Sequence, residues 1–196
     1  MARRSDHSKE ELEKLIFDTA NKLVEQDGLD AMSARKVTTA IGYSPGTIYS
    51  FYDNLDELTL AVNGKTLDLI YNKLEKAISK AKSSKQAIKA IAEAYLNYAQ
   101  KNINRFRALY EFNYSQESGQ SLPNWYQDKV TRIFELIDAV LNRNHCGNNE
   151  QAKVLWAGIH GIAILSLSGK LDSVKVKSSK KLLENYLDIY LRGIKK

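Results

Sequence analysis

The sequence predicts an all-helical protein of about nine helices. Through most of the chain, apolar residues recur at positions i, i+3, i+4 and i+7, which is the spacing of one face of an α-helix. Only two prolines and ten glycines occur in 196 residues, and no stretch alternates apolar and polar residues as a half-buried strand does. We expect an N-terminal three-helix domain over residues 1–53 and a second helical domain over residues 54–196, with the helix from about residue 54 linking the two.

The first predicted helix, over residues 8–27, has a clear signal at each end. Ser8 and Glu11 have the spacing of a capping box at its start, and Gly28 is placed to end it. Leucine, isoleucine, alanine and valine residues between these ends follow the helical period. The pattern therefore predicts one amphipathic helix.

Two shorter helices are expected next. Ser33 is a good N-cap for a helix that runs to about Ile41, because Gly42 breaks the pattern. Ser44 is placed to cap the following helix, over about residues 45–51, and Pro45 takes its first helical position, where a missing N–H costs nothing. Together they predict two helices joined by a tight turn.

The rest of the chain continues the helical period. Asn54 and Glu57 form a second capping-box pair that opens a long helix, and Pro123 opens a later one. Helices are also expected beyond Ser83, over residues 106–112, and over about residues 150–169 and 178–193. Polar loops are expected at residues 115–121 and 143–149.

The composition excludes several classes of protein. The single cysteine, Cys146, excludes an intrachain disulfide and a cysteine-cluster metal site, which fits a reducing cytoplasm. No apolar stretch follows the N-terminal arginines, so no signal peptide is expected. The most apolar run, residues 154–167, is too short and too polar to span a bilayer. We therefore expect a soluble cytoplasmic protein with no membrane partner.

No pattern of catalytic residues stands out. The three histidines, His7, His145 and His160, are far apart and lack the spacing of metal ligands, and no phosphate-binding glycine loop is present. Cys146 lies beside His145 in a polar loop, and we interpret it as incidental, with redox sensing as the alternative. The sequence predicts that the protein is not an enzyme and has no cofactor or metal.

Residues 33–58 carry the most informative pattern. Two short helices joined by a glycine-containing turn are typical of a helix-turn-helix, whose second helix enters the major groove of DNA. The second helix has no acidic side chain, and hydroxyls, backbone N–H groups and basic side chains are suitable partners for phosphates and base edges. The candidate DNA-binding residues are Arg35, Lys36, Tyr43, Ser44, Pro45, Gly46, Thr47, Tyr49 and Ser50.

The N-terminal arginines are further candidates. Arg3 and Arg4, on a flexible arm, would add minor-groove contacts or form a solvated tail. The formal charge of +6 does not itself mark a DNA site, because residues 1–64 hold seven Lys or Arg against eleven Asp or Glu, a net of −4. The remaining residues carry the basic excess.

The segment Ile41–Tyr52, followed by Glu57 and Leu58, resembles the helix-turn-helix motif of the TetR family of bacterial transcriptional regulators. The resemblance implies that Val37 and Ile48 pack the core of the motif, that Thr47 and Tyr49 contact phosphates, and that Gly46 faces the bases. The alternative is a helical hairpin with no role in nucleic-acid binding.

The chain departs from the family pattern at three positions. Leu55 stands where the family usually has a phosphate-binding lysine, and Tyr43 and Ile41 replace smaller residues. These departures predict either a lower affinity for DNA or a phosphate contact moved to Tyr43 or Lys65.

The second domain is rich in aromatic residues, which suit both a core and a ligand cavity. Trp156 and His160 share a helix face and precede Gly161, and this string resembles a TetR subgroup with a Trp-x-x-x-His-Gly signature. His160 would bind a ligand or would be a core histidine with its hydrogen bonds satisfied. The candidate ligand-binding residues are Tyr95, Phe106, Tyr110, Trp125, Phe134, Trp156 and His160. They favour an apolar or aromatic small-molecule effector, and Arg105, Arg107 and Lys101 leave an anionic one open.

The last two helices are expected to form a homodimer interface, because each carries a stripe that needs a partner surface. The expected interface residues are Gly158, Gly161, Leu165, Leu183, Tyr186, Leu187 and Tyr190. The alternative is that both stripes pack within one subunit.

The leading functional hypothesis is a ligand-responsive transcriptional regulator, a repressor released from a palindromic double-stranded operator by a small-molecule inducer. The alternatives are a DNA-binding architectural or activator protein without a ligand, and a helical enzyme or lipid carrier.

Overall fold

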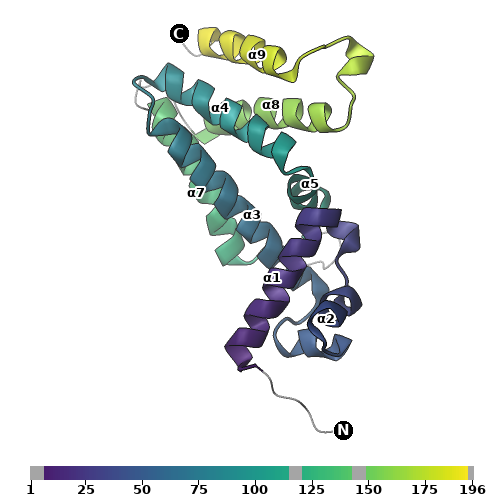
Figure 1. Ribbon diagram of the computed structural model, residues 1–196. Helices are drawn as coiled ribbons and strands as arrows, with labels where there is room; N and C mark the ends of the chain where they lie inside the picture. Colours follow the sequence, from purple (N-terminus) through teal and green to yellow (C-terminus); the bar gives the residue numbers. More distant parts are fainter. Residues whose placement is uncertain (1–6, 115–120, 143–148, 194–196) are drawn as a thin grey trace, which may run out of the picture. The chain divides into compact units, whose positions relative to one another are not determined.

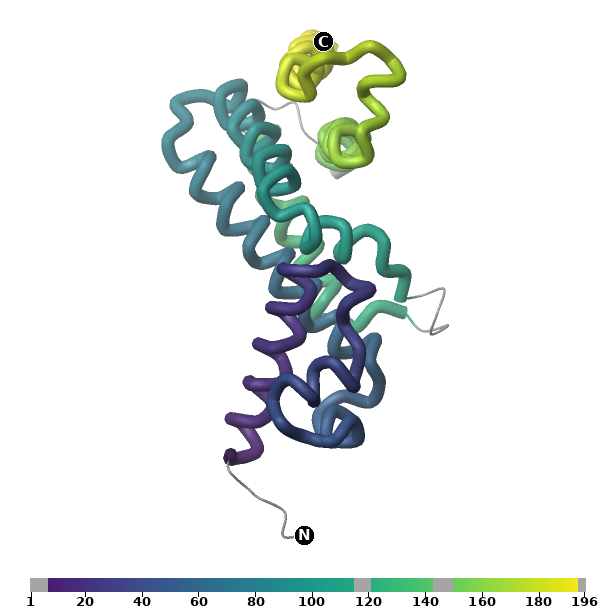
Figure 2. Tube along the Cα trace, turned by 45° about the vertical axis from the view of Figure 1, so that its right-hand side comes forward, coloured from purple at the N-terminus to yellow at the C-terminus, as the bar shows by residue number. Residues whose placement is uncertain are grey.

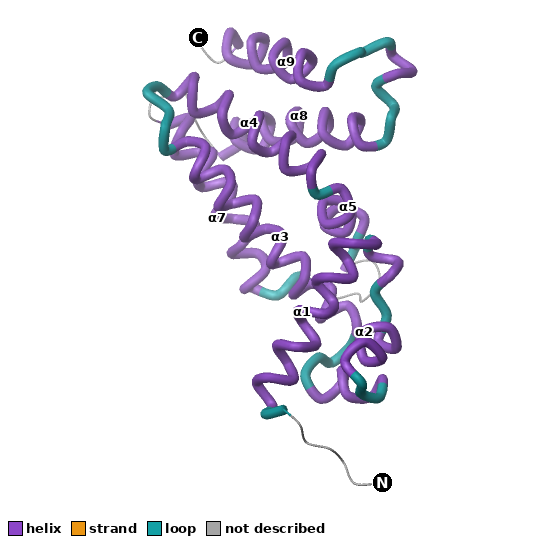
Figure 3. Tube along the Cα trace, viewed as in Figure 1, coloured by secondary structure: helices purple, strands orange, loops and turns teal. Residues whose placement is uncertain are grey.

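The computed structural model describes residues 7–114, 121–142 and 149–193, and within these ranges all regular secondary structure is helical (Figure 3). The all-helical prediction is confirmed. Along the chain in Figure 1 the helices are α1 (Lys9–Asp27), η1 (Leu29–Ala31), α2 (Ala34–Ile41), η2 (Pro45–Ser50), α3 (Leu55–Ile78), α4 (Ser84–Lys101), α5 (Ile103–Glu111), α7 (Asn124–Asn142), α8 (Asn149–Leu167), η3 (Asp172–Val174) and α9 (Ser179–Gly193), of which η1, η2 and η3 are 3-10 helices.

Chain contacts divide the protein into two compact units. The first unit comprises residues 1–66 and 104–122, and the second unit comprises residues 67–103 and 123–196. Helix α3 begins in the first unit and ends in the second. The expected division by function, at residues 53 and 54, stays a prediction.

Local capping fixes the ends of α1 as the sequence predicts. The Ser8 hydroxyl accepts a hydrogen bond from the Glu11 backbone N–H at 3.2 Å, and the Ser8 N–H donates to Glu11 Oε2 at 2.7 Å. Gly28 follows the helix with φ +85°, a conformation that costs glycine nothing. Reciprocal capping satisfies N–H groups that would otherwise lack a partner.

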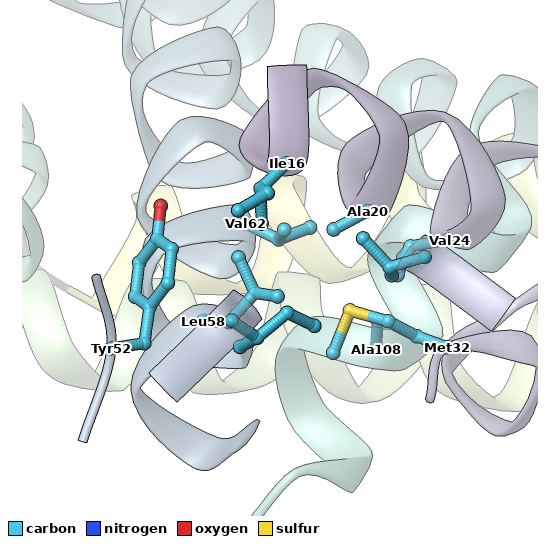
Figure 4. Close-up of a cluster of buried hydrophobic side chains, with 10 residues drawn as sticks. Ile16, Ala20, Val24, Met32, Tyr52, Leu58, Val62 and Ala108 are labelled. Carbon is cyan, nitrogen blue, oxygen red and sulfur yellow. The ribbon is translucent and has the colours of Figure 1, made fainter. Parts of the chain in front are cut away.

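The core of the first unit joins five helices of the chain. Ile16, Ala20 and Val24 of α1 pack against residues of α2, η2, α3 and α5 (Figure 4). The buried cluster comprises Ile16, Ala20, Val24, Met32, Val37, Ile48, Tyr52, Leu58, Val62 and Ala108. The three α1 residues repeat at four-residue spacing, which is the helical period from which the sequence predicted this face.

Polar contacts fasten α5 to the same unit. Asn104 donates to the carbonyls of Gln26 at 2.8 Å and Glu25 at 3.2 Å, which are among the carbonyls left without a helical partner at the end of α1. The buried Arg105 guanidinium donates to Glu25 Oε2 at 2.9 Å and to Asn21 Oδ1. Asn63 of α3 donates to the Ala108 carbonyl at 3.0 Å. Thus α5 is held to both α1 and α3.

The second unit is built around α4, which packs against α7, α8 and α9. In Figure 2, α8 and α9 lie side by side at one end of this unit, connected through residues 168–178. A charged cluster ties the end of α3 to α7: Asp68 accepts from Lys129 Nζ at 2.7 Å and from Arg132, whose guanidinium lies 4.4 Å from the centre of the Tyr71 ring. None of the described helices is long and apolar enough to cross a membrane.

The third expected helix differs from the prediction. Residues 45–50 form the 3-10 helix η2 instead of an α-helix, and the Ser44 hydroxyl lies 3.3 Å from the Thr47 hydroxyl instead of capping a backbone N–H. A segment of six residues gains little from the α-helical hydrogen-bond ladder, so its tertiary contacts decide its geometry. The expected loops at residues 115–121 and 143–149 lie almost wholly outside the described residues.

The contacts between α8 and α9 correct part of the expected dimer interface. Leu183 and Leu187 are each 1% exposed within the single chain, so neither forms surface that a second subunit would cover. Tyr186 lies against Gly158 and donates to the carbonyls of Val154 at 3.1 Å and Leu155 at 3.2 Å. The Tyr190 hydroxyl donates to the Gln151 carbonyl at 2.8 Å. The small residue at position 158 thus admits an aromatic ring of the same chain.

We expect Gly158→Ala to lower the free energy of unfolding by about 1–3 kcal/mol, since overpacking of a close contact costs about that much. The new Cβ would overlap the Tyr186 ring. Urea unfolding followed by circular dichroism measures the change. In a Tyr186→Ala background the same substitution should be neutral or stabilising, because alanine favours a helix over glycine by up to about 1 kcal/mol. Equal losses in both backgrounds would contradict the contact.

Candidate functional site

Helix α2 presents two cations on the surface of the first unit. The Ser33 hydroxyl accepts from the Lys36 N–H at 3.2 Å, which starts the helix where the sequence predicts. Val37 is fully buried on the opposite face, and the buried Thr38 donates its hydroxyl proton to the Ala34 carbonyl at 2.8 Å. Arg35 and the Lys36 side chain are therefore exposed in the first turn.

The turn after α2 requires a left-handed residue. Gly42 has φ +78° and ψ 24°, a conformation that other residues adopt at a steric cost. The Tyr43 N–H donates to the Thr38 carbonyl at 2.9 Å, and this bond closes the end of the helix. The chain then reverses into η2, giving the helix-turn-helix arrangement that the sequence predicts.

In η2 one side chain is buried and its neighbours face solvent. Ile48 has no exposed surface, whereas the adjacent Tyr49 is 56% exposed. Of the other candidate DNA-binding residues here, Ser44, Pro45, Gly46 and Ser50 are exposed and Thr47 is half-buried. The structure therefore brings the described DNA-binding candidates together on α2, the turn and η2, while Arg3 and Arg4 lie outside the described residues.

Tyr43 has a partner that sequence reasoning missed. Its hydroxyl oxygen lies 2.8 Å from Nδ1 of His7, and the two ring centres are 6.0 Å apart. The two residues are 36 positions apart, so no local pattern joins them. The only signal in the sequence is that His7 directly precedes the cap of the first helix.

Leu55, at the start of α3, stands where the family pattern has a lysine. Leu55 packs against the buried cluster of the first unit, so it is a partly buried apolar residue without a hydrogen-bond donor in its side chain. Asn54 Oδ1 caps the Glu57 N–H at 2.9 Å, but the Glu57 carboxylate accepts from the Asp53 N–H at 2.7 Å, one residue earlier than the expected capping box. Burial, with the Glu13 and Glu57 charges, raises the pKa of Tyr52 to about 12, so this tyrosine stays neutral.

Four of the predicted ligand-binding residues form an aromatic cluster in the second unit, comprising Tyr95, Phe134, Trp156 and His160. His160 stacks on Trp156 with ring centres 4.8 Å apart, and Phe134 meets Trp156 edge to face at 5.5 Å. The Tyr95 hydroxyl lies 2.9 Å from His160 Nδ1. Burial lowers the pKa of His160 and raises that of Tyr95, so the pair is neutral at neutral pH.

The other three predicted ligand-binding residues lie elsewhere. Phe106 and Tyr110 contact each other in the first unit, with ring centres 5.7 Å apart. Trp125 is 41% exposed and meets the Tyr126 ring. Arg105 was one of the cations that would suit an anionic effector. It is buried and donates to Asn21 and Glu25, so it fastens α5 to α1 instead.

A cavity of about 420 Å³ lies in the first unit, at a place that sequence reasoning missed. None of the seven predicted ligand-binding residues lines it. Its wall combines apolar side chains with four carboxylates and one arginine: Asp27, Gly28, Leu29, Asp30, Met32, Leu55, Asp56, Thr59, Asn104, Arg107, Glu111 and Phe112. Among the described residues, no group of three or more His, Cys, Asp or Glu side chains is arranged to hold a metal ion.

Comparison with known families agrees with this arrangement. Residues 16–62 match the N-terminal model described as bacterial regulatory proteins of the tetR family, and residues 88–190 match a tetracyclin repressor-like C-terminal domain. The chain belongs to the TetR family. It is therefore a DNA-binding transcriptional regulator, and the family is not enzymatic.

Individual relatives of this TetR-family chain are distant. An uncharacterised HTH-type transcriptional regulator of Mycobacterium tuberculosis is 22% identical over 163 residues, which cover 81% of this chain and 72% of the relative. A structure of a protein of unknown function from Rhodococcus sp. RHA1 has a TM-score of 0.78 at 19% identity and covers 100% of both chains. FadR of Bacillus subtilis, solved in complex with stearoyl-CoA, has a TM-score of 0.60 at 13% identity and covers 90% of this chain and 96% of its own. At these identities the solved structures support the fold alone.

Burial of neutral His160 makes stability depend on pH. Because the pKa of His160 is lowered on folding, the unfolded chain binds more protons near pH 6, and the contribution of this residue falls as the pH falls below about 6.5. We expect the drop in Tm between pH 7.5 and pH 5.5 to be smaller in His160→Gln than in the wild type. Calorimetry at the two pH values measures the difference. An equal drop in both proteins would show that folding does not disfavour the protonated form of His160.

Proposed function

We propose that this TetR-family regulator is a ligand-responsive repressor that binds a palindromic operator as a homodimer and is released by a small-molecule inducer. The observation that carries the proposal is the surface of α2 and η2. This surface exposes two cations, hydroxyl groups and a glycine above a fully buried Val37 and Ile48. A rigid scaffold with donors on its outer face is what recognition of a DNA groove needs.

In this proposal five residues of the surface contact DNA. Arg35, Lys36, Thr47 and Tyr49 bind phosphates and thereby set the position of the protein on the duplex. Gly46 approaches the bases. No atom of the described chain lies within 4 Å of a Cβ built at Gly46, so packing within the protein does not require glycine there. That freedom supports a close approach by DNA instead.

The homodimer would form through α8 and α9. The residues available for it are the exposed apolar side chains of these helices, Val154 (58%), Leu165 (40%) and Ile189 (71%), and Gly161, whose Cα has open space beside it. A two-fold axis would pair the same surface of two copies, and two recognition surfaces would then read two half-sites. Gly158, Leu183 and Leu187 are left out of this interface because they pack within the chain.

The aromatic cluster is the proposed effector site. Trp156, His160 and Tyr95 provide a stacked face and a polar pair in one place, the combination of apolar surface and few polar groups that small-molecule sites use. Long-chain acyl-CoA is the first class to test, since FadR of Bacillus subtilis, which has a similar fold, was solved with stearoyl-CoA. The Trp-x-x-x-His-Gly subgroup assignment belongs to the same proposal.

Two connections would carry the response to the DNA-binding surface. Helix α3 is continuous from Leu55 to Ile78, and α4 is followed after Asn102 by α5, which Arg105 and Asn104 fasten to α1. An effector that favours one position of α4 or α3 would shift the separation of the two recognition surfaces. A coupling of about 1–3 kcal/mol suffices for this kind of regulation.

Selection from a random-sequence duplex library at near-physiological salt tests the operator, and light scattering tests the dimer. A recovered palindrome with half-sites about one helical turn apart supports the proposal. A regulator without an effector, the alternative, would bind the same operator but would not respond to any member of a ligand panel. Recovery of no motif would overturn the operator.

Tyr49→Ala should weaken binding to the selected duplex and to a random duplex by the same factor, because a phosphate contact carries no sequence information. Fluorescence anisotropy measures both affinities. The variant should fold normally, since Tyr49 is 56% exposed. Ile48→Ala is the matched comparison: the fully buried neighbour should lose about 2–5 kcal/mol of stability. Unchanged affinity in Tyr49→Ala would contradict the assignment of η2.

Trp156→Phe should reduce the effect of stearoyl-CoA on operator affinity while leaving affinity without ligand unchanged. The reason is that Trp156 belongs to the second unit and stacks on His160. Anisotropy with and without ligand separates the two quantities, and Trp125→Phe serves as a control outside the cluster. Loss of affinity for DNA in the absence of ligand would contradict this division of roles.

A further inference from the structure

His7 and Tyr43 lie together at the edge of the DNA-binding surface. Tyr43 occupies the turn between α2 and η2, and His7 directly precedes the capping residue of α1. The hydroxyl oxygen and Nδ1 are 2.8 Å apart, which is hydrogen-bond distance, and the rings are tilted by 51°. His7 is exposed and Tyr43 is half-buried, so the pair lies at the surface of the first unit.

The proton on His7 determines what Tyr43 offers to a ligand. When Nδ1 carries no proton, it accepts the Tyr43 hydroxyl proton, and the hydroxyl then presents only lone pairs outward. When Nδ1 carries a proton, it donates to the Tyr43 oxygen, and the hydroxyl proton is free to bind an anion. A charged imidazole has protons on both nitrogens and always leaves Tyr43 in this donating state.

Apart from Arg35 and Lys36, the proposed DNA-binding surface has few positive charges. Residues 45–50 contain no Lys or Arg, and residues 1–64 have a net charge of −4 when histidine is neutral. Leu55, at the start of α3, is packed against the core of the first unit and offers no cation there. A protonated His7 would add one positive charge beside a tyrosine hydroxyl, a pair of groups suited to a phosphate.

We propose that His7 and Tyr43 together bind one phosphate of the DNA backbone, and that this contact requires the charged imidazole of His7, which adds a positive charge and leaves the Tyr43 hydroxyl proton free to donate. The inference rests on the proposed use of α2 and η2 as the DNA-binding surface. Binding is then linked to protonation, and affinity for DNA rises as the pH falls through the range in which imidazole titrates. The contact replaces the one that Leu55 lacks.

The groups that face His7 favour this role. Among the described residues they are Tyr43, on the turn, and Glu11, in the first turn of α1, which interacts electrostatically with His7. The Ser8 N–H and hydroxyl group hold the Glu11 carboxylate and its backbone at the helix start and lower the pKa of Glu11. Glu11 therefore stays ionised over the range of the experiment and favours the charged imidazole without changing with pH.

The test compares affinity for DNA at pH 8.0 and pH 6.0 in the full-length protein. The probes are a labelled duplex carrying the selected consensus and a 30-base-pair duplex of random sequence, both followed by anisotropy. We expect wild-type binding to be about fivefold tighter per subunit at pH 6.0, the order of one solvent-exposed hydrogen bond. The slope of log K against log salt should steepen by about 0.9 per subunit.

Variants separate a phosphate contact from a structural effect. His7→Asn keeps a short neutral side chain and should remove both the dependence on pH and the change in salt slope. Tyr43→Phe removes the hydroxyl and should weaken binding at pH 6.0 more than at pH 8.0. His145→Asn, which removes a histidine from the second half of the sequence, should keep the wild-type profile.

The outcomes are distinct. An unchanged pH profile in His7→Asn would overturn the inference but leave the proposed function standing, and a large loss in Lys65→Gln would then place the phosphate contact on α3. Failure of the wild type to bind either duplex at any salt would overturn the proposed function together with the inference.

Discussion

The complete burial of Ile48 is the constraint on which the proposed DNA-binding surface depends. A six-residue 3-10 helix has too few hydrogen bonds to hold its own geometry, so its one buried side chain fixes where it lies. Ile48 belongs to the same cluster as Ile16 and Ala20 of α1 and Val37 of α2. With Ile48 inside, the alternation of the turn places Tyr49 outside. The packing of Ile48 therefore determines both the core of the first unit and the position of the proposed recognition surface.

That core includes a segment from much later in the chain. Ala108 of α5 is buried in the cluster, and Asn104 and Arg105 bind the last turns of α1. Helix α5 follows α4 after a single residue, so the chain passes directly from a helix of the second unit to one that stabilises the first. The matched C-terminal family domain begins at residue 88 and thus includes α5. The matched C-terminal family domain and the second packing unit therefore have different boundaries.

Local chemistry explains which features could be predicted from the sequence. The caps at Ser8 and Ser33 and the left-handed Gly42 depend on residues within four positions of each other, so their patterns are visible in the sequence. The contacts of Gly158 with Tyr186, of Arg105 with Glu25 and of Tyr43 with His7 join residues 28 or more positions apart. Helical periodicity shows which face of α9 is apolar but not whether the neighbour that covers it is α8 of the same chain or a second subunit. For this reason the sequence left open which surface covers Leu183 and Leu187, and in the structure both pack within the chain.

Protonation of the two described histidines would affect different properties, namely folding stability at His160 and affinity for DNA at His7. His160 is half-buried against Trp156, and burial favours its neutral form, so acid opposes the folded aromatic cluster. His7 is exposed beside Tyr43, where a phosphate would favour the charged form. Acid therefore weakens one unit of the fold while it strengthens the proposed contact with DNA. A single pH profile of DNA binding mixes the two effects. His7→Asn separates them: it should abolish the rise in affinity for DNA at moderately low pH and retain the loss of stability that His160 causes.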